Sequence, residues 1–173
     1  MHISNEKNIS FETPFSIEES EVSKLQLEEL VDTALRAVYK YDKYLIDIKA
    51  HERDIVFRFG IYFQGLLIKH EKYNKYNLDV EYNRNLYDPK KTENFNNGVY
   101  PDVILHERGN NDNNILVLEF KGYWNNRKDE IEKDKSKLWD LMNPTGDYKY
   151  KKGYIVILET NSFERQPFYL TLT

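Results

Sequence analysis

The segment that most constrains the fold is the run Gly-Tyr-Ile-Val-Ile-Leu-Glu at residues 153–159. Its apolar residues are consecutive rather than alternating, which predicts a β-strand that is buried on both faces. A strand of this kind needs neighbouring strands in a sheet and helices on each side of that sheet. The run therefore favours an α/β fold built on a central sheet.

Three segments carry apolar residues at helical spacing. The first helix is expected over residues 20–40, after a capping-box pattern at residues 16–19. A second helix is expected over residues 51–69, with Asp47 as its cap, and a third over residues 128–142. These helices would supply the layers that cover the sheet.

The remaining strands are expected between and after these helices. Residues 77–83 alternate apolar and polar side chains, and residues 84–98 are rich in loop-forming types. Further strands are expected over residues 100–107 and 114–121, with a final edge strand over residues 168–172. The order of elements predicts a mixed central β-sheet flanked by α-helices.

Bulk properties limit the class of protein. Residues 1–15 form a polar segment, and residues 16–173 are expected to fold as a single domain. The chain has no cysteine, which excludes disulfides and thiolate zinc sites. The sequence shows neither a signal-peptide pattern nor about 18 consecutive apolar residues, so we expect a cytoplasmic protein with no membrane partner.

The charge balance argues against a protein that coats nucleic acid non-specifically. The formal net charge is -4 and the isoelectric point is about 5.6. Clustered carboxylates that bind divalent cations would lower the formal charge in the same way. Short lysine runs, such as those at residues 69–75 and 149–152, are most simply solvated surface.

Two of the expected strands carry charged side chains at matched positions. If residues 108–113 form the turn between them, the antiparallel register puts Asp102 directly opposite Glu119. Lys121 shares their face, because side chains alternate along a strand. Two carboxylates with Cβ atoms about 5 Å apart repel each other unless a positive charge lies between them. Oxygen ligands of this kind suit Mg²⁺ or Mn²⁺, so the pair predicts a divalent metal site.

A structural interpretation of the same residues remains open from the sequence. Glu119 and Lys121 could form an ion pair at a strand end, and Asp102 could cap a turn after Pro101. The opposite face of the second strand is apolar and is expected to pack against a helix; it carries Leu116, Leu118 and Phe120.

The apolar stripe of the helix expected over residues 51–69 begins with a carboxylate. One turn before Ile55 and Val56, the stripe reaches Glu52. A half-buried glutamate needs a partner or a cation, because leaving it unpaired costs on the order of several kcal/mol. A first-turn glutamate can instead face water and interact with the helix dipole. This segment alone favours neither interpretation.

The pair Pro101-Asp102, followed by Glu119-Phe120-Lys121, resembles the signature of the PD-(D/E)xK nuclease superfamily, which has the restriction-endonuclease-like fold. That family has a core of a helix, three antiparallel strands, a helix and a further strand, with the motif on the second and third strands. A carboxylate often comes from the first helix, and Glu52 matches that position. The resemblance covers about residues 50–159 and implies that the helix before them is an N-terminal addition.

The resemblance also implies roles for the individual residues. Asp102 and Glu119 would ligate Mg²⁺, or Mn²⁺ as a substitute, together with the main-chain carbonyl of Phe120. Glu52 would bind the metal directly or through water. Lys121 would orient or deprotonate the attacking water and neutralise charge on the phosphate. Together these roles amount to metal-assisted hydrolysis of a phosphodiester.

Other candidates carry weaker signals. Family members often use a polar residue from the helix after the third strand, for which the chain offers Lys133, Asp134 and Lys137 without distinguishing among them. His106 could approach a substrate but is more simply a satisfied strand histidine, and Tyr123 and Trp124 could stack on a base. Histidine spacing for a zinc site, a phosphate-binding glycine loop and a Gly-x-Ser-x-Gly turn are all missing from the sequence.

The function that the resemblance implies is that of a metal-dependent nuclease acting on DNA, with an endonuclease favoured over an exonuclease. Repair, recombination, restriction and defence against mobile DNA are the pathways it suggests, and RNA remains open as a substrate. A chain of 173 residues has little surface for reading sequence, so a homodimer or a partner protein is expected to supply specificity. One alternative is a catalytically silent nuclease-like module that binds nucleic acid or protein. Another is an unrelated protein in which the motif is accidental.

Overall fold

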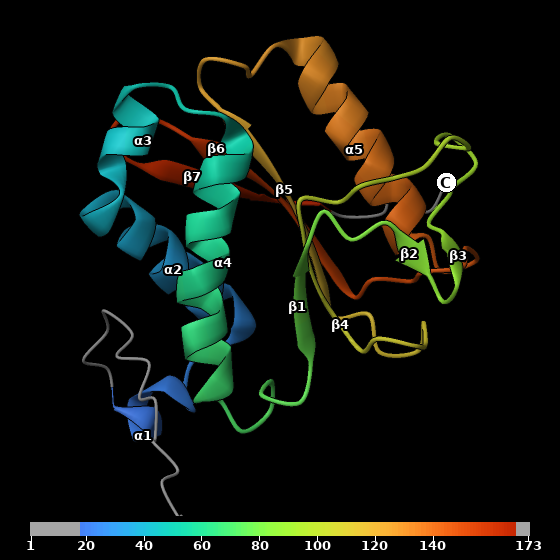
Figure 1. Cartoon of the computed structure of the whole chain (residues 1–173), viewed down its shortest axis with the longest axis horizontal. Helices are drawn as coiled ribbons and strands as arrows, with labels where there is room; N and C mark the ends of the chain where they lie inside the picture. The colour runs from blue at the N-terminus through green and yellow to red at the C-terminus, as the bar shows by residue number, and fades with distance from the viewer. Residues whose placement is uncertain (1–17, 169–173) are drawn as a thin grey trace, which may run out of the picture.

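The computed structural model describes residues 18–168. Over this range the chain forms a central sheet with helices on both faces (Figure 1). The helices are α1 (Glu19–Val22), α2 (Leu27–Tyr41), α3 (Lys43–Asp47), α4 (Glu52–Ile68) and α5 (Lys128–Met142). The strands are β1 (Asn77–Val80), β2 (Arg84–Asn85), β3 (Asp88–Pro89), β4 (Val103–His106), β5 (Leu116–Gly122), β6 (Lys152–Leu158) and β7 (Phe163–Pro167).

The main sheet has the strand order β1-β4-β5-β6-β7 and contains both strand directions. Strand β4 runs antiparallel to both β1 and β5, β5 and β6 run parallel, and β7 runs antiparallel to β6. Helix α5 forms the crossover between the parallel strands β5 and β6, a connection that cannot be made by a tight turn. The predicted α/β class with a mixed central sheet is confirmed.

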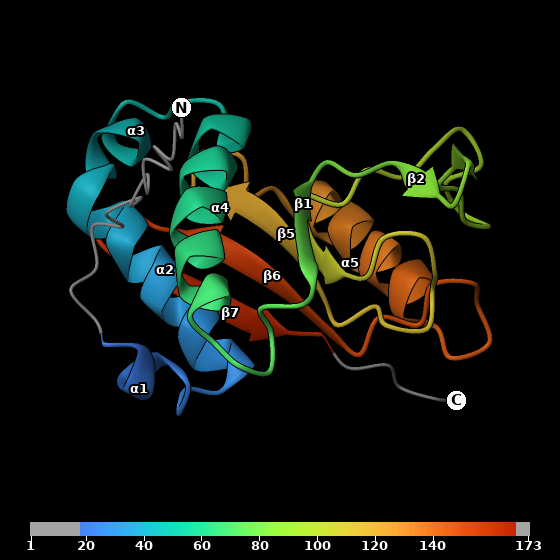
Figure 2. The same cartoon turned by 60° about the horizontal axis from the view of Figure 1, so that its bottom comes forward.

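The two faces of the sheet are covered by different helices (Figure 1; Figure 2). Helices α2 and α4 pack together on one face, and α5 lies on the other. Strand β6 contributes Val156 and Leu158 to the core on the α2 and α4 side, and Ile155 and Ile157 to the core on the α5 side. The expectation that this apolar run is buried on both faces is confirmed.

The expectation of one helix over residues 20–40 is wrong, because the chain forms α1 and α2 with residues 23–26 between them. Helix α2 starts with a capping pair, in which the Gln26 N–H donates to the Glu29 carboxylate at 2.6 Å. The capping pattern expected at residues 16–19 lies mostly outside the described residues. The helical spacing of the apolar residues predicts α2 itself but not its cap at Gln26, which lies within the expected range of residues 20–40.

Asp47 does not cap the second long helix, so that prediction from the sequence is wrong. It is the last residue of α3, a helix of five residues that is too short to show a periodic apolar stripe. The chain then passes through Lys49 at φ 53° before α4 begins. His51 caps α4 instead, with its Nδ1 atom accepting from the Arg53 N–H at 3.3 Å. Helices α4 and α5 otherwise match the predicted ranges to within one residue.

The strands before the hairpin differ from their predicted ranges. The strand expected over residues 77–83 ends at Val80, because Glu81 takes up a left-handed backbone conformation with φ 50°. The loop expected over residues 84–98 contains the short hairpin of β2 and β3. These departures follow from local backbone conformation that the apolar pattern does not encode.

The edge strand was expected over residues 168–172, of which residues 169–172 lie outside the described part of the chain. The structure places β7, which lies earlier in the sequence, at the edge of the sheet beside β6. It pairs with β6 through its backbone, and Arg165 bonds Asp32 of α2 at 2.8 Å. Tertiary contacts rather than apolar patterning therefore hold this strand.

A buried lysine ties the segment that precedes β4 to the rest of the fold. Lys90 is 2% exposed, and its ammonium group donates a hydrogen bond to the Tyr150 hydroxyl at 3.0 Å. The ammonium also lies 5.6 Å from the ring centre of Tyr82 and 5.2 Å from that of Tyr148, within range of cation–π attraction. Burial lowers the pKa of Lys90 to about 8, although the charge of Asp79 acts in the opposite direction.

This lowered pKa predicts a rise in stability with pH. Between pH 8 and about 10.5 the folded protein binds fewer protons at Lys90 than the unfolded chain does, so the free energy of unfolding increases across that window. Lys90→Met is expected to remove about 2 kcal/mol of this increase between pH 8 and pH 10. Urea unfolding at several pH values measures it, with the exposed neighbour Lys91→Met as the control. Parallel pH profiles for all three proteins would contradict the assignment.

Candidate functional site

The register of the central hairpin agrees with the sequence prediction. Val103 pairs with Leu118, and Leu105 pairs with Leu116. Extending this register by one residue places Asp102, just before β4, opposite Glu119 on β5. The two carboxylates therefore meet at the end of the hairpin, as expected.

Strand β5 extends beyond β4 at this end, which leaves backbone N–H groups that must find other acceptors. The Phe120 N–H donates to Asp102 Oδ2 at 2.6 Å. The Gly122 N–H donates to Glu52 Oε1 at 2.7 Å. Two of the predicted site carboxylates thus complete the hydrogen bonding of β5, and Glu52 does not simply face water.

The structure rules out the pairings in the structural interpretation of this motif. Asp102 bonds across to β5 rather than capping the turn after Pro101. Glu119 accepts a hydrogen bond from the ammonium of Lys137, and Lys121 forms an ion pair with Asp134 at 2.9 Å. Both of these partners lie on α5, so the charged residues of the hairpin are held by the helix above them.

Helix α5 contributes two of the three polar candidates among which the sequence did not distinguish, Asp134 and Lys137. Asp134 is 3% exposed and forms an ion pair with Lys121 through Oδ2, while its Oδ1 atom lies 3.1 Å from Lys137 Nζ. Lys133, the third candidate on this helix, is exposed and takes no part. A signal was present in the sequence, because Asp134 lies on the same helical stripe as the buried Leu138.

The apolar face of β5 behaves as predicted. The Phe120 ring lies 5.1 Å from that of Phe59 on α4, between ring centres. Leu116 and Leu118 join the same core. Asp102 and Glu119 therefore stand on the α5 face, while the opposite face of β5 packs against α4.

The environment of the two opposed carboxylates disfavours their charged forms. Burial raises the pKa of Glu119 well above its ordinary value, and the charge of Asp102 raises it further. Burial also raises the pKa of Asp102 to about 6, against the opposing effect of Lys137. Perturbed carboxylates of this kind gather at functional sites more often than elsewhere.

The two lysines of the site remain protonated. Burial alone would lower the pKa of Lys121, but the bond to Asp134 and the charge of Glu52 outweigh it and leave the pKa above its ordinary value. The same balance holds for Lys137, whose pKa is raised mainly by Glu119 and Asp134. The surroundings of both ammonium groups therefore favour their charged form beside the carboxylates.

The donor chemistry of the site fits a hard divalent cation. Glu119 is fully buried, and its Oε1 atom has no hydrogen-bond partner among the described residues. A buried carboxylate oxygen without a partner is costly unless a cation or a donor reaches it. In an extended strand the N–H and C=O of one residue project to the same side, so the Phe120 carbonyl leaves β5 on the side of Asp102.

The site does not hold a preassembled cluster of three ligands. Within residues 18–168, no three acidic or histidine side chains stand close enough together to bind a metal ion. Glu52 is instead engaged by the Gly122 N–H and lies 3.9 Å from Lys121 Nζ. Asp102, Glu119 and the Phe120 carbonyl are the groups best placed to hold a cation.

The weaker candidates have structural partners. His106 Nε2 lies 2.8 Å from Asp79 Oδ2, at the end of β4 away from Asp102, so the interpretation as a satisfied histidine is confirmed. Tyr123 and Trp124 pack edge to face with ring centres 5.0 Å apart, just beyond the site, where Lys49 Nζ lies 5.6 Å from the Tyr123 ring centre.

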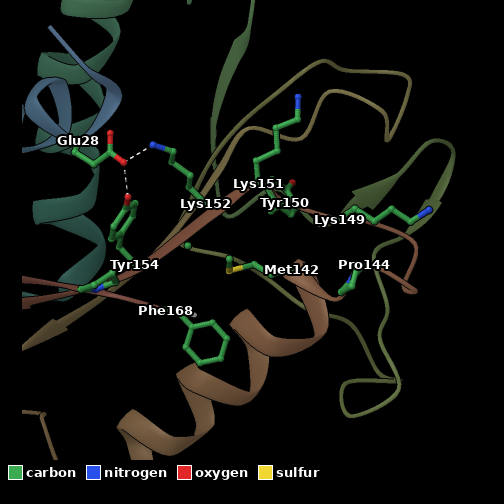
Figure 3. A pocket seen from close by; sticks show the side chains of 11 residues that line it. Glu28, Met142, Pro144, Lys149, Tyr150, Lys151, Lys152, Tyr154 and Phe168 are labelled. Atoms are coloured by element: carbon green, nitrogen blue, oxygen red, sulfur yellow. Dashed lines mark hydrogen bonds and ion pairs between the residues drawn. The ribbon is translucent and has the colours of Figure 1, made fainter. Parts of the chain in front are cut away.

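A cavity of about 540 Å³ lies away from these residues, at the start of β6. Figure 3 shows Glu28 turned toward Lys152 and Tyr154, both of which bond its carboxylate. Burial raises the pKa of Glu28, but these two bonds outweigh it and hold the pKa at about 2. None of the site residues predicted from the sequence is among the residues that line this cavity.

Comparison of the chain with protein-family models, with curated proteins and with solved structures found no match. Among the described helices, none is long and apolar enough to cross a membrane. The geometry of the site itself therefore carries the functional interpretation.

Proposed function

We propose that this protein is a metal-dependent nuclease that hydrolyses phosphodiester bonds in DNA. The observation that carries the proposal is the fully buried Glu119, opposed by Asp102 and with one carboxylate oxygen left without a partner among the described residues. The order α4-β1-β4-β5-α5-β6 supports it, because this is the order of elements that the PD-(D/E)xK resemblance implies.

In the proposed reaction, Asp102, Glu119 and the Phe120 carbonyl would hold Mg²⁺ or Mn²⁺, with Glu52 reaching it directly or through water. A bound divalent cation polarises a phosphoryl oxygen and makes a water molecule more acidic. The residues of the chain then position the reactants. Asp102 and Glu119 would bring their negative charge to the cation rather than to each other, which removes the repulsion between them.

Lys121 would act on the water and on the phosphate. Its side chain is 9% exposed, and its ammonium group is oriented by Asp134 and Glu52, at 2.9 Å and 3.9 Å. From this position it can hydrogen-bond the attacking water and neutralise charge that grows on the phosphate. Attack in line with the leaving group would give a 5′-phosphate and a 3′-hydroxyl, as the resemblance implies.

The test is cleavage of supercoiled plasmid in Mg²⁺ or Mn²⁺, with chelator and labelled RNA as parallel reactions. Lys121→Met is expected to lower the cleavage rate by about 10²- to 10³-fold, because a preorganised donor that stabilises charge developing in the transition state contributes about that much. Lys133→Met, which changes an exposed lysine on α5, is expected to leave the rate unchanged. Cleavage that survives Lys121→Met, or that persists in chelator, would contradict the proposed mechanism.

A second candidate function is a catalytically silent module that binds nucleic acid or protein. Lys137 favours it, because this lysine gives Glu119 a positively charged partner from within the chain. If the plasmid stays intact and the melting temperature does not respond to Mg²⁺, the results would support a binding module over a nuclease.

We further propose that sequence or structure specificity comes from a homodimer or a partner protein, because the chain is short and its isoelectric point is acidic. Light scattering during cleavage of a defined DNA checks this. Strong site preference from a monomer acting alone would overturn it.

A further inference from the structure

The buried carboxylate at the centre of the site has a partner on only one of its two oxygens. Glu119 Oε2 bonds the ammonium of Lys137, and the Glu119 side chain is 1% exposed. Its other oxygen, Oε1, is buried and has no hydrogen-bond partner among the residues that the structure describes. Lys137 therefore supplies the positive charge at this carboxylate, but only on one side of it.

Lys137 has a second carboxylate within reach. Asp134 lies one helical turn earlier on α5, and its Oδ1 atom is 3.1 Å from Lys137 Nζ. Lys137 can thus move away from Glu119 and keep a charged partner. Its ammonium group would not be left buried and unpaired, which is the state that would make such a move costly.

The formal charges of the site match a divalent cation. Four carboxylates and two ammonium groups leave a formal excess of two negative charges when all of them are ionised. Asp134 serves both lysines, one on each oxygen, so it anchors the positive charges on the helix side of the site. The six residues are Glu52, Asp102, Lys121, Glu119, Asp134 and Lys137.

We propose that Lys137 is an internal counter-cation that competes with the divalent cation for Glu119. Binding of the cation moves the Lys137 ammonium from Glu119 to Asp134. This inference rests on the proposed function, because it takes Asp102 and Glu119 as the metal ligands. It goes beyond that function by assigning to one lysine the control of how tightly the cation binds.

The experiment is a titration of the intact protein with Mn²⁺ alone, without nucleic acid. Binding is measured by isothermal titration calorimetry. Lys137→Met removes the competing charge with an unbranched side chain and is expected to tighten Mn²⁺ binding at least tenfold. Lys137→Arg keeps the charge and is expected to bind Mn²⁺ within about twofold of the parent. Lys133→Met on the same helix is the matched surface control and is expected to match the parent.

A structural role for Lys137 predicts a different pattern. If Lys137 only holds the fold together, Lys137→Met should lower the melting temperature without tightening Mn²⁺ binding, and Lys137→Arg should restore stability. Unchanged or weaker binding in Lys137→Met overturns the inference. If Lys137→Met is poorly folded by circular dichroism, Lys137→Gln gives the same comparison, with the same tightening expected.

The outcomes for the inference and for the proposed function can be separated. A parent that binds Mn²⁺ and cleaves DNA, with no tightening in Lys137→Met, overturns the inference alone. If the Lys137→Met variant binds Mn²⁺ and the parent does not, the inference is supported. That result would also argue against nuclease activity in the parent. Absence of Mn²⁺ binding in every variant overturns both.

Discussion

Asp102→Asn is expected to abolish cleavage of DNA while making the metal-free protein more stable. The carboxylate lies opposite Glu119, and burial raises its pKa to about 6, so folding disfavours its charge at neutral pH. An amide in its place removes that charge but keeps an oxygen that can accept the Phe120 N–H. We expect the free energy of unfolding of the metal-free protein to rise by on the order of 1–2 kcal/mol at pH 7.

The sign of this effect follows from proton binding. Because the pKa of Asp102 is higher in the folded protein than in the unfolded chain, the folded protein binds more protons between about pH 4 and pH 6. The metal-free parent therefore loses stability as the pH rises through this window, and Asp102→Asn should lose less. The cleavage rate should fall by about 10³-fold or more, because the variant lacks a proposed metal ligand.

The measurement combines urea unfolding without metal, melting in Mg²⁺ and plasmid cleavage. Asp112→Asn, on the exposed turn at the other end of the hairpin, is the matched control and should match the parent in all three. Mg²⁺ should raise the melting temperature of the parent and of the control but not of Asp102→Asn. A variant that is less stable without metal and still responds to Mg²⁺ would show that Asp102 serves the fold only.

Phe59→Ala is expected to lower the free energy of unfolding by about 3–5 kcal/mol. Phe59 is fully buried on α4, and its ring centre lies 5.3 Å from that of Phe63 and 5.1 Å from that of Phe120. Alanine would leave a cavity beneath β5, on the face opposite Glu119 and Lys121. Because closely packed interiors relax only partly around such a cavity, both the transfer free energy and the lost contacts add to the cost.

Phe57 provides the control for this prediction. It lies on the same helix two residues earlier but is 61% exposed, so Phe57→Ala is expected to change stability by less than about 0.5 kcal/mol. Urea unfolding curves of the two variants and the parent give the comparison. Similar losses in Phe57→Ala and Phe59→Ala would mean that α4 does not pack on β5 as described.

The hairpin of β4 and β5 shows which structural features can be predicted from residues close together in the chain. Alternation along two strands and the length of the turn between them were sufficient to predict the register that places Asp102 opposite Glu119, because an antiparallel pairing is set once its turn is set. The apolar run of β6 predicted burial on both faces for the same kind of reason. These features depend on residues close together in the chain.

The partners of the charged residues depended on the tertiary structure. The sequence alone allows an ion pair between Glu119 and Lys121. In the structure Glu119 pairs with Lys137, and Lys121 pairs with Asp134, because α5 crosses over this end of β5. The tertiary structure likewise brings Glu52, in the first turn of α4, to the Gly122 N–H at the end of β5 that extends beyond β4.

The sequence by itself determined the α/β class, the extents of α4 and α5, and the face of β5 on which the carboxylates lie, since periodicity and turn length encode these locally. The tertiary structure alone decided the break between α1 and α2, the position of β7 and the ion pairs of the site. Those features depend on which distant segments meet. The partner of a buried charged side chain is set by which segments pack against it, and a local sequence pattern does not predict that partner.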